Sequence, residues 1–438
     1  MPSGGERADM SHIQQRMPIG RVLVLRNFWP YFTGNLLSNA GTWFQNIAAV
    51  LLVYRLTRSP FLVGVVNFSQ FAAVLFLAPI AGPAADRFDR RRLIVITQLA
   101  AVLLALLLAL LTATEAATPA IVIAMTLALG VTTALATPAL SALVPSLVSR
   151  AELPSAVALV SVTFNLARAL GPIAAVFVIA NFGIAAAFAV NALSFLALVA
   201  GLALVQPRGL GPPSGVRPRL RESVALVGSR RALLAPLLVV AAVSLTSDPV
   251  NTLTPSFSTD IYGAADTFTG YLVGAFGAGA VTAAFTLIPR STPSYRLIVL
   301  TLALQAVGMV VFALSTTEVV GLISLFIAGF GFLGSITTST SLLHLALEDA
   351  HRGRVMALWS VAFQGSRPVG SLVDGALASL AGIRIAGMVM AVPALAASLG
   401  LAAAVLGRSR QPAEGGQVEP RTTSSGSSDT VTGSSEGS

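Results

Sequence analysis

Residues 93–114 carry no charged side chain over 22 consecutive positions. A helix of about 20 apolar residues is long enough to cross the hydrocarbon core of a membrane. Because lipid offers no hydrogen-bond partners, a segment of this kind must form a helix or a strand of a closed barrel. The chain lacks the alternating segments of about ten residues that barrels require. The sequence therefore predicts that the chain crosses a membrane as helices.

Similar apolar runs recur along the whole chain. Only 10% of the 438 residues are charged and 55% are hydrophobic, whereas about 25% of a soluble domain is charged. Too little polar surface is present to cover a water-exposed globule. We expect twelve spans, at 28–54, 60–84, 93–114, 118–147, 154–181, 183–205, 232–257, 267–289, 295–315, 318–346, 355–380 and 384–406.

An internal repeat relates the two halves of the chain. Residues 158–171 read ALVSVTFNLARALG and residues 357–370 read ALWSVAFQGSRPVG, with identical residues at seven positions. Duplicated halves are typical of secondary transporters. We predict an all-α membrane protein of two pseudo-symmetric six-helix bundles. The expected units are residues 1–205 with a cytoplasmic N-terminal tail, a cytoplasmic linker at 206–231, a second bundle at 232–407, and a disordered cytoplasmic tail at 408–438.

The arginines predict how the chain is oriented. With the N-terminus in the cytoplasm, 22 arginines fall on the cytoplasmic side, three outside and two within spans. Arginine-rich loops remain in the cytoplasm, so we expect a multi-pass protein of the plasma membrane with both termini cytoplasmic. The net charge of +9 then reflects topology, and we expect no nucleic-acid partner.

Several chemistries are disfavoured by residue usage. The chain has no cysteine and no lysine, and its three histidines are scattered. The phosphate-binding loop of many ATPases requires a lysine, and thiolate ligands require cysteine. We therefore expect no catalytic residues, no metal site and no cofactor.

The segment 82–92 reads GPAADRFDRRR between the second and third spans. It resembles the signature of the major facilitator superfamily in the loop joining helices two and three. The resemblance implies a gating latch in which Asp86 lies against the start of span eleven, near residues 353–356. A helix N-terminus attracts a carboxylate. Gly82 would permit close helix approach, and Arg87, Arg90 and Arg91 would hold Asp86 and the inner leaflet.

Further strings carry a closer resemblance over about residues 25–405. They read SNAGTW (38–43), YRLTRSP (54–60), ADRFDRRRL (85–93), TPALSALVPSLV (137–148), FNLARALGP (164–172) and RGRVMAL (352–358). These strings look like the branch of enterobactin exporters and macrolide efflux pumps, described as transmembrane secretion effectors, which implies export in exchange for protons. Arg58 replaces the usual glycine of that branch, and Ala175 departs from the G-P-x-x-G pattern of drug antiporters.

Four charged residues fall inside predicted spans: Arg168, Arg367, Asp248 and Asp374. Such residues are costly in lipid and are therefore functional candidates for proton or substrate coupling. An unpaired Asp248 would be able to bind and release a proton, whereas pairing with Arg168 or Arg367 would make it a static strut. Exposure to water in a vestibule is a third interpretation. The arginines either join helices or bind an anionic substrate.

The first span also carries a polar stripe. Asn35, Asn39, Thr42 and Asn46 follow helical spacing and so share one face. We expect this face to line a central cavity, although cementing of neighbouring helices is the alternative. Asn165 and Gln364, which coincide in the repeat, are further candidates for the lining.

These features favour a secondary active transporter that exports lipophilic or amphiphilic small molecules, such as drugs or siderophores, by proton antiport with alternating access. The expected partners are a small-molecule substrate, protons and the lipid bilayer, and the expected state is a monomer. Uptake of a nutrient or metabolite is one alternative. A lipid scramblase or a sensor that transports nothing is another.

Overall fold

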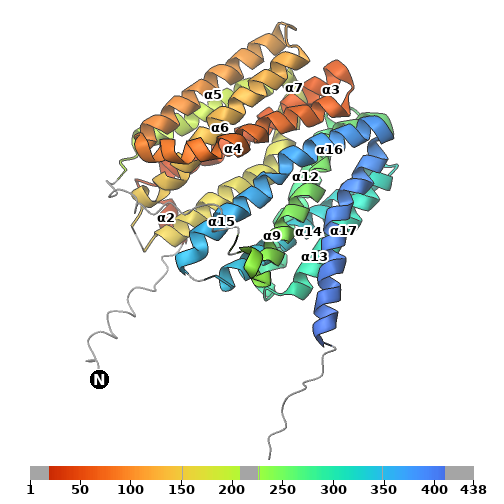
Figure 1. The fold of residues 1–438 in the computed structure, drawn as a ribbon. Helices are drawn as coiled ribbons and strands as arrows, with labels where there is room; N and C mark the ends of the chain where they lie inside the picture. Colours follow the sequence, from red (N-terminus) through yellow and green to blue (C-terminus); the bar gives the residue numbers. More distant parts are fainter. Residues whose placement is uncertain (1–18, 150, 208–224, 226, 348, 410–438) are drawn as a thin grey trace, which may run out of the picture.

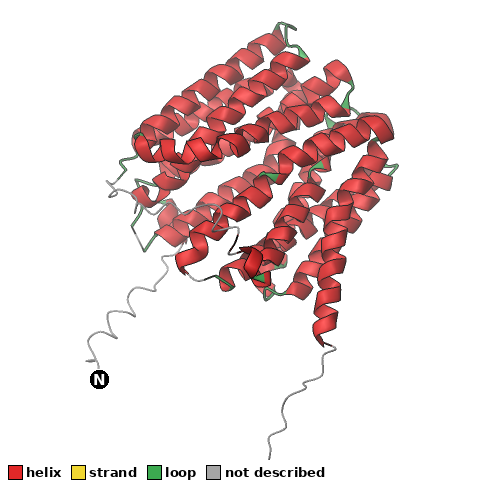
Figure 2. Cartoon of the chain, in the orientation of Figure 1, coloured by secondary structure: helices red, strands yellow, loops and turns green. Residues whose placement is uncertain are grey.

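The structure is a computed structural model that describes residues 19–149, 151–207, 225, 227–347 and 349–409. Within these ranges, the side chains at 82–86, 165 and 168 are among those not described. The predicted linker at 206–231 and tail at 408–438 lie mostly outside the described residues. The described secondary structure is helical throughout, with short loops between the helices (Figure 2).

The first half begins with a short helix and continues with long ones. Its elements are α2 (Ile19–Leu23), α3 (Trp29–Thr57), α4 (Pro60–Arg87), α5 (Arg90–Ala113), α6 (Pro119–Leu147) and α7 (Leu153–Leu204). The helix α7 holds two spans, because Gly183 turns the chain at a φ of 83° that only glycine adopts readily.

The second half contains shorter pieces. Its elements are α9 (Arg231–Ser247), α10 (Pro249–Thr252), α11 (Thr254–Ser256), η2 (Phe257–Ile261), α12 (Phe268–Thr286), η3 (Ile288–Arg290), α13 (Tyr295–Leu314), α14 (Glu318–Leu345), α15 (Asp349–Gln364), α16 (Ser366–Ala381) and α17 (Ile383–Ser409). The seventh span is a succession from α9 to η2, and the eleventh span consists of α15 and α16.

Ten of the described helical segments are long and apolar enough to cross a membrane individually. The fifth span contains a shorter apolar helix, Leu153–Phe164, and the eleventh is interrupted at Gly365. Counting α7 as two spans, and the successions from α9 to η2 and from α15 to α16 as one each, gives twelve. The predicted all-α membrane fold of twelve spans is confirmed.

The helices form two bundles whose pairings correspond. In the first bundle α3 packs on α7, and in the second bundle α9 packs on α15 and α16. Figure 1 shows α4, α5 and α6 together on one side and α9, α13, α14 and α17 on the other. The bundles meet where α4 packs on α16 and where α7 packs on α12.

Glycine allows α4 and α16 to approach closely. A Cβ atom built on Gly64 would lie 2.2 Å from the carbonyl oxygen of Ser371, and one built on Gly375 would lie 3.0 Å from that of Pro60. We call the end of the molecule where α3 ends and α4 begins the Arg55 side. The opposite end, where α5 begins, is the Arg90 side. The close approach of α4 and α16 lies toward the Arg55 side.

Candidate functional site

The seventh span is interrupted at a buried carboxyl group. Asp248 follows the last residue of α9, and Pro249, which has no N–H to donate, begins α10. Only 2% of Asp248 is exposed. Interrupted helices that carry polar groups at membrane depth are typical of binding sites in secondary transporters. Asp248 thus lies inside the protein in this conformation rather than in an open vestibule.

The eleventh span brings a second carboxyl group to Asp248. A Cβ atom on Gly370 would lie 3.2 Å from the Cβ of Asp248, so the two helices touch there. Asp374 is one helical turn beyond Gly370, and Thr252 is one turn beyond Asp248. Because both spans run in the same direction, Asp374 faces Thr252. Asp374 is completely buried and lies close enough to interact electrostatically with Asp248.

The carboxyl groups of Asp248 and Asp374 lack most of the hydrogen bonds that their oxygens could accept. In the described part of the chain, neither carboxyl oxygen of Asp374 has a hydrogen-bond partner, nor does Oδ2 of Asp248. The hydroxyl of Thr252 lies beside both groups, and that of Ser371 lies beside Asp248, without completing these bonds. Native proteins rarely bury charged oxygens without partners. A bound proton would remove part of this cost.

Arg367 supplies a buried positive charge beside the two carboxyl groups. Its guanidinium carbon lies 4.8 Å from the ring centre of Phe71 and 5.3 Å from that of Phe363. Its charge acts on Asp248, yet among the described carboxyl groups neither Asp248 nor Asp374 lies within the 4.0 Å of an ion pair with it. The site therefore holds two carboxyl groups and one guanidinium that is not locked to either.

A small cavity lies between the bundles beside Arg367. Its volume of about 10 Å³ is about that needed for one water molecule. A second cavity of similar size shares Trp43 and Asn251 with the first. The first cavity is lined by Trp43, Asn46, Ile47, Val50, Asn67, Phe71, Asn251 and Arg367. Polar groups from both bundles therefore meet in a space too small for a drug-sized molecule in this conformation.

The polar stripe of α3 has several environments. Asn46 lines the cavity and accepts a hydrogen bond from Gln70 Nε2 at 2.6 Å. Asn35 is buried and donates to Thr163 Oγ1 of α7 at 3.1 Å. Asn39 and Thr42 are half-buried and donate to carbonyl groups of their own helix. Gln364 is half-buried at the end of α15, whereas the side chains of Asn165 and Arg168 lie outside the described residues.

The predicted gating motif covers the junction of α4 and α5. Arg90 donates to the carbonyl oxygen of Ala142 in α6 at 3.2 Å, and Arg91 donates to that of Ala203 in α7 at 3.1 Å. Arg87 is exposed at the end of α4. These arginines gather helix ends on the Arg90 side. Gly82 and the side chain of Asp86 are not described, so the predicted contact with residues 353–356 stays a prediction.

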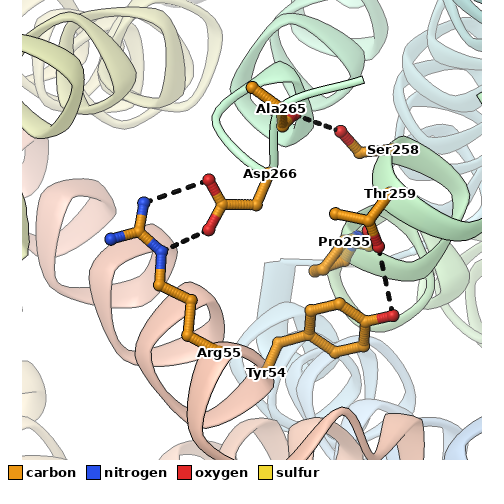
Figure 3. Close-up of polar contacts among 7 residues, drawn as sticks. All are labelled: Tyr54, Arg55, Pro255, Ser258, Thr259, Ala265 and Asp266. Atoms are coloured by element: carbon orange, nitrogen blue, oxygen red, sulfur yellow. Dashed lines mark hydrogen bonds and ion pairs between the residues drawn. The ribbon is translucent and has the colours of Figure 1, made fainter. Parts of the chain in front are cut away.

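No sequence pattern predicted the contacts that join the bundles on the Arg55 side. Both carboxyl oxygens of Asp266 accept hydrogen bonds from Arg55, as Figure 3 shows. Tyr54 donates to Asp260 Oδ2 at 2.6 Å and accepts from Thr259 at 3.3 Å. The one signal in the sequence was that Arg55 and Asp266 carry opposite charges in segments predicted on the same side of the membrane. That signal cannot identify a pair by itself.

A buried hydrogen bond also joins the bundles at the carboxyl site. Asn67 Nδ2 of α4 donates to Thr252 Oγ1 of α10 at 3.2 Å. No pattern in the sequence singled out either residue, because an uncharged amide and a hydroxyl are common in helices. The bond links the first bundle directly to the residue that faces Asp374.

Known proteins of similar sequence are membrane transporters. The family model of transmembrane secretion effectors matches residues 21–422. An enterobactin exporter of Shigella boydii serotype 4 is 24% identical over 364 residues, covering 81% of this chain and 85% of that protein. An enterobactin exporter of Escherichia coli O139:H28 is 23% identical over the same shares.

Solved structures with the same fold are also transporters. A bacterial homologue of the human lysosomal transporter Spinster, in an inward-facing and unoccupied conformation, aligns with a TM-score of 0.70 at 13% identity. That alignment covers 89% of this chain and 99% of that one. The nucleoside transporter NupG aligns with a TM-score of 0.65 at 12% identity, covering 87% of this chain and 98% of that one. At these identities the likeness extends to the fold alone.

Proposed function

The chain belongs to the transmembrane secretion effector family of the major facilitator superfamily, and from that premise we propose that it exports lipophilic or amphiphilic small molecules by proton antiport. The chain is a multi-pass membrane transporter of small molecules. Drugs and siderophore-like compounds are the proposed substrate class, and alternating access of the two bundles is the proposed mechanism. The enterobactin exporters among its relatives favour outward transport.

The arginines support an orientation for this export. The helix ends near Arg90 and Arg91 belong to the arginine-rich segments, and such segments face the cytoplasm. The Arg90 side is therefore the proposed cytoplasmic side, with both termini there, and the Arg55 side faces outward across the plasma membrane. The gating motif of Gly82, Asp86, Arg87, Arg90 and Arg91 would then close the cytoplasmic side.

The observation that carries the proposed coupling is the buried group of Asp248, Asp374 and Arg367. One guanidinium can compensate one carboxylate, so the second carboxyl group requires a proton or another cation when it is buried. Binding and release of that proton would change the charge of the site by one unit. A proton drives a transporter only if its affinity differs between the two states, and burial in one state creates such a difference.

The cavity beside Arg367 supports the proposed substrate path. It lies between the bundles, and Trp43 and Phe71 offer apolar surface next to the amides of Asn46 and Asn251. Mixed apolar and polar walls suit amphiphilic molecules. Rotation of the bundles away from each other on one side would enlarge this space, and Arg367 would then be available to an anionic group of the substrate.

Transport by proteoliposomes under an imposed pH gradient tests the proposal. We expect efflux of the lipophilic dye Hoechst 33342 or of a catecholate siderophore to be driven by the gradient and to move protons in the opposite direction. Asp248→Asn should abolish the proton movement, since an amide does not titrate here, while the protein remains folded. Glu318→Gln, which removes an exposed acid from the first turn of α14, serves as the matched control.

Two outcomes would contradict the proposal. Proton movement in the same direction as the substrate would indicate symport, as in a proton-coupled importer, rather than antiport. Unchanged coupling in the Asp248→Asn variant would remove that carboxyl group from the mechanism.

A further inference from the structure

One buried hydrogen bond connects the carboxyl site to the opposite bundle. Asn67 Nδ2 donates to Thr252 Oγ1 at 3.2 Å, and the two residues are 4% and 0% exposed. Asn67 belongs to α4, which packs on both α10 and α16. This bond therefore crosses the interface at which the two bundles must separate if the Arg55 side opens.

Thr252 also lies against both carboxyl groups. Its backbone N–H donates to the carbonyl oxygen of Asp248 at 3.3 Å, which sets it one turn farther along the span. The contact between Gly370 and Asp248 brings Asp374, one turn beyond Gly370, opposite Thr252. The Thr252 hydroxyl lies beside the carboxyl groups of both residues, although Oδ2 of Asp248 and both carboxyl oxygens of Asp374 have no hydrogen-bond partner among the described residues. One hydroxyl thus lies between two carboxyl groups and an amide of the other bundle.

The chemistry of a hydroxyl makes this position sensitive to charge. A hydroxyl has one proton to donate and two lone pairs that accept. Because Asn67 is a donor, the Thr252 proton is left for a carboxylate. Donation to an ionised group makes a stronger hydrogen bond than donation to a neutral one. Consecutive bonds of this kind also polarise and strengthen one another.

We propose that Thr252 and Asn67 form a relay that couples the charge of the Asp248–Asp374 pair to the contact between the two bundles. This inference rests on the proton antiport proposed above. When the pair has released its proton, both carboxyl groups are ionised, and Thr252 donates to one of them and holds Asn67 more tightly. When one of the two carboxyl groups carries the proton, the pair is less negative, and the bond to Asn67 weakens. An ionised site without substrate therefore keeps the Arg55 side closed.

Few other charged groups bear on this site. Among the described residues of α4, α9, α11, α12, α16 and α17, which surround α10, the charged groups that act on Asp248 and Asp374 are Arg367 and the two carboxyl groups themselves.

The role of the relay in the transport cycle is to prevent proton movement that is not coupled to substrate. Without it, an empty and ionised site could return to the outward-open state, and protons would cross without substrate.

Proton leak in the absence of dye tests the relay. We measure it in proteoliposomes with an internal pH indicator, alongside proton movement driven by Hoechst 33342. Thr252→Val keeps the shape of the side chain and removes the hydroxyl, so we expect the leak to rise about tenfold, as for the loss of a bond to a charged group. Asn67→Leu should also raise the leak, and Thr252→Ser should restore the low leak of the unaltered protein.

The chain offers a matched control two residues away. Thr254 is equally buried, but its hydroxyl donates to the carbonyl oxygen of Val250 in its own segment at 2.8 Å. Thr254→Val should leave the leak unchanged.

The outcomes separate the relay from the antiport. If the unaltered protein couples dye to protons and Thr252→Val leaks no more than Thr254→Val, the relay is wrong and the antiport stands. If the unaltered protein moves no protons with dye, the antiport fails, and the relay fails with it. Should Thr252→Val not assemble, the leak of Asn67→Leu decides in the same way.

Discussion

Arg367 is a buried cation whose guanidinium lies against two aromatic rings. A guanidinium within about 6 Å of a ring centre gains about 0.5–2 kcal/mol, and Arg367 has two such rings, one from each bundle. Phe71 belongs to α4 and Phe363 to α15. Movement of one bundle relative to the other would separate these rings and leave the guanidinium freer to approach Asp248. The charge balance of the site is thus sensitive to conformation.

A double-mutant cycle tests the interaction between these two charges. We expect Arg367→Gln to lower the free energy of unfolding more than the double variant Arg367→Gln with Asp248→Asn, because the single change leaves a buried carboxylate without its cation. The expected coupling energy is about 1–3 kcal/mol, the range for residues in one polar network. Unfolding in detergent micelles, followed by circular dichroism, measures it. Additive effects would indicate that Arg367 and Asp248 act independently.

At the scale of the helices, interruptions and close approaches decide where the polar groups lie. The seventh and eleventh spans are interrupted at Asp248 and Gly365, next to the charges they carry. Elsewhere glycine residues allow the helices to pack closely. A Cβ atom on Gly279 of α12 or Gly329 of α14 would lie 1.9 Å from a carbonyl oxygen of the other helix. Small residues of this kind let helices approach closely within a membrane.

The α12–α14 contact supports a prediction about stability. Gly329→Ala should destabilise the protein by about 1–3 kcal/mol, because the new methyl group would force the two backbones apart. Gly400→Ala in α17 is the matched control, since nothing lies within 4 Å of a Cβ atom there. Alanine favours a helix over glycine by about 1 kcal/mol, so the control should be neutral or stabilising. Thermal unfolding in detergent compares the two, and equal melting temperatures would contradict the close contact.

At the scale of the molecule, several described contacts join the two bundles on the Arg55 side. There Arg55 pairs with Asp266 (Figure 3). On the same side Tyr54 donates to Asp260, and α4 approaches α16 at Gly64 and Gly375. These contacts hold the two bundles together on this side. Opening on this side requires them to break together.

Removal of the ion pair should favour opening. A partly exposed ion pair contributes about 0.2–1 kcal/mol, so Arg55→Gln should raise the open population by up to about fivefold. The chain has no cysteine, so Val50→Cys in the cavity lining would be the one reactive thiol. An impermeant maleimide, added outside intact cells, should label this thiol faster in the Arg55→Gln variant than in the protein that retains Arg55. Arg384→Gln is the control, because Arg384 donates to Leu314 of its own bundle. Equal labelling of the two variants would show that the pair does not hold this side closed.

Much of the fold and part of the site followed from the sequence. The span predicted at 93–114 corresponds to α5, Arg90–Ala113, and the break predicted between 181 and 183 corresponds to the turn at Gly183. Charges predicted within spans drew attention to Asp248, Asp374 and Arg367. Their separate roles were left open, because the alternatives depended on distances between helices. The latch at Asp86 and the orientation of the termini stay predictions.

The sequence alone determined that this chain crosses a membrane as helices, because apolar length and the need to satisfy the backbone are local properties of each segment. Only the tertiary structure decided that Asp374 faces Thr252, that Arg367 lies between Phe71 and Phe363, and that Arg55 pairs with Asp266. These contacts join segments far apart along the chain. Their register is set by how whole helices pack at small residues, and no local pattern encodes it.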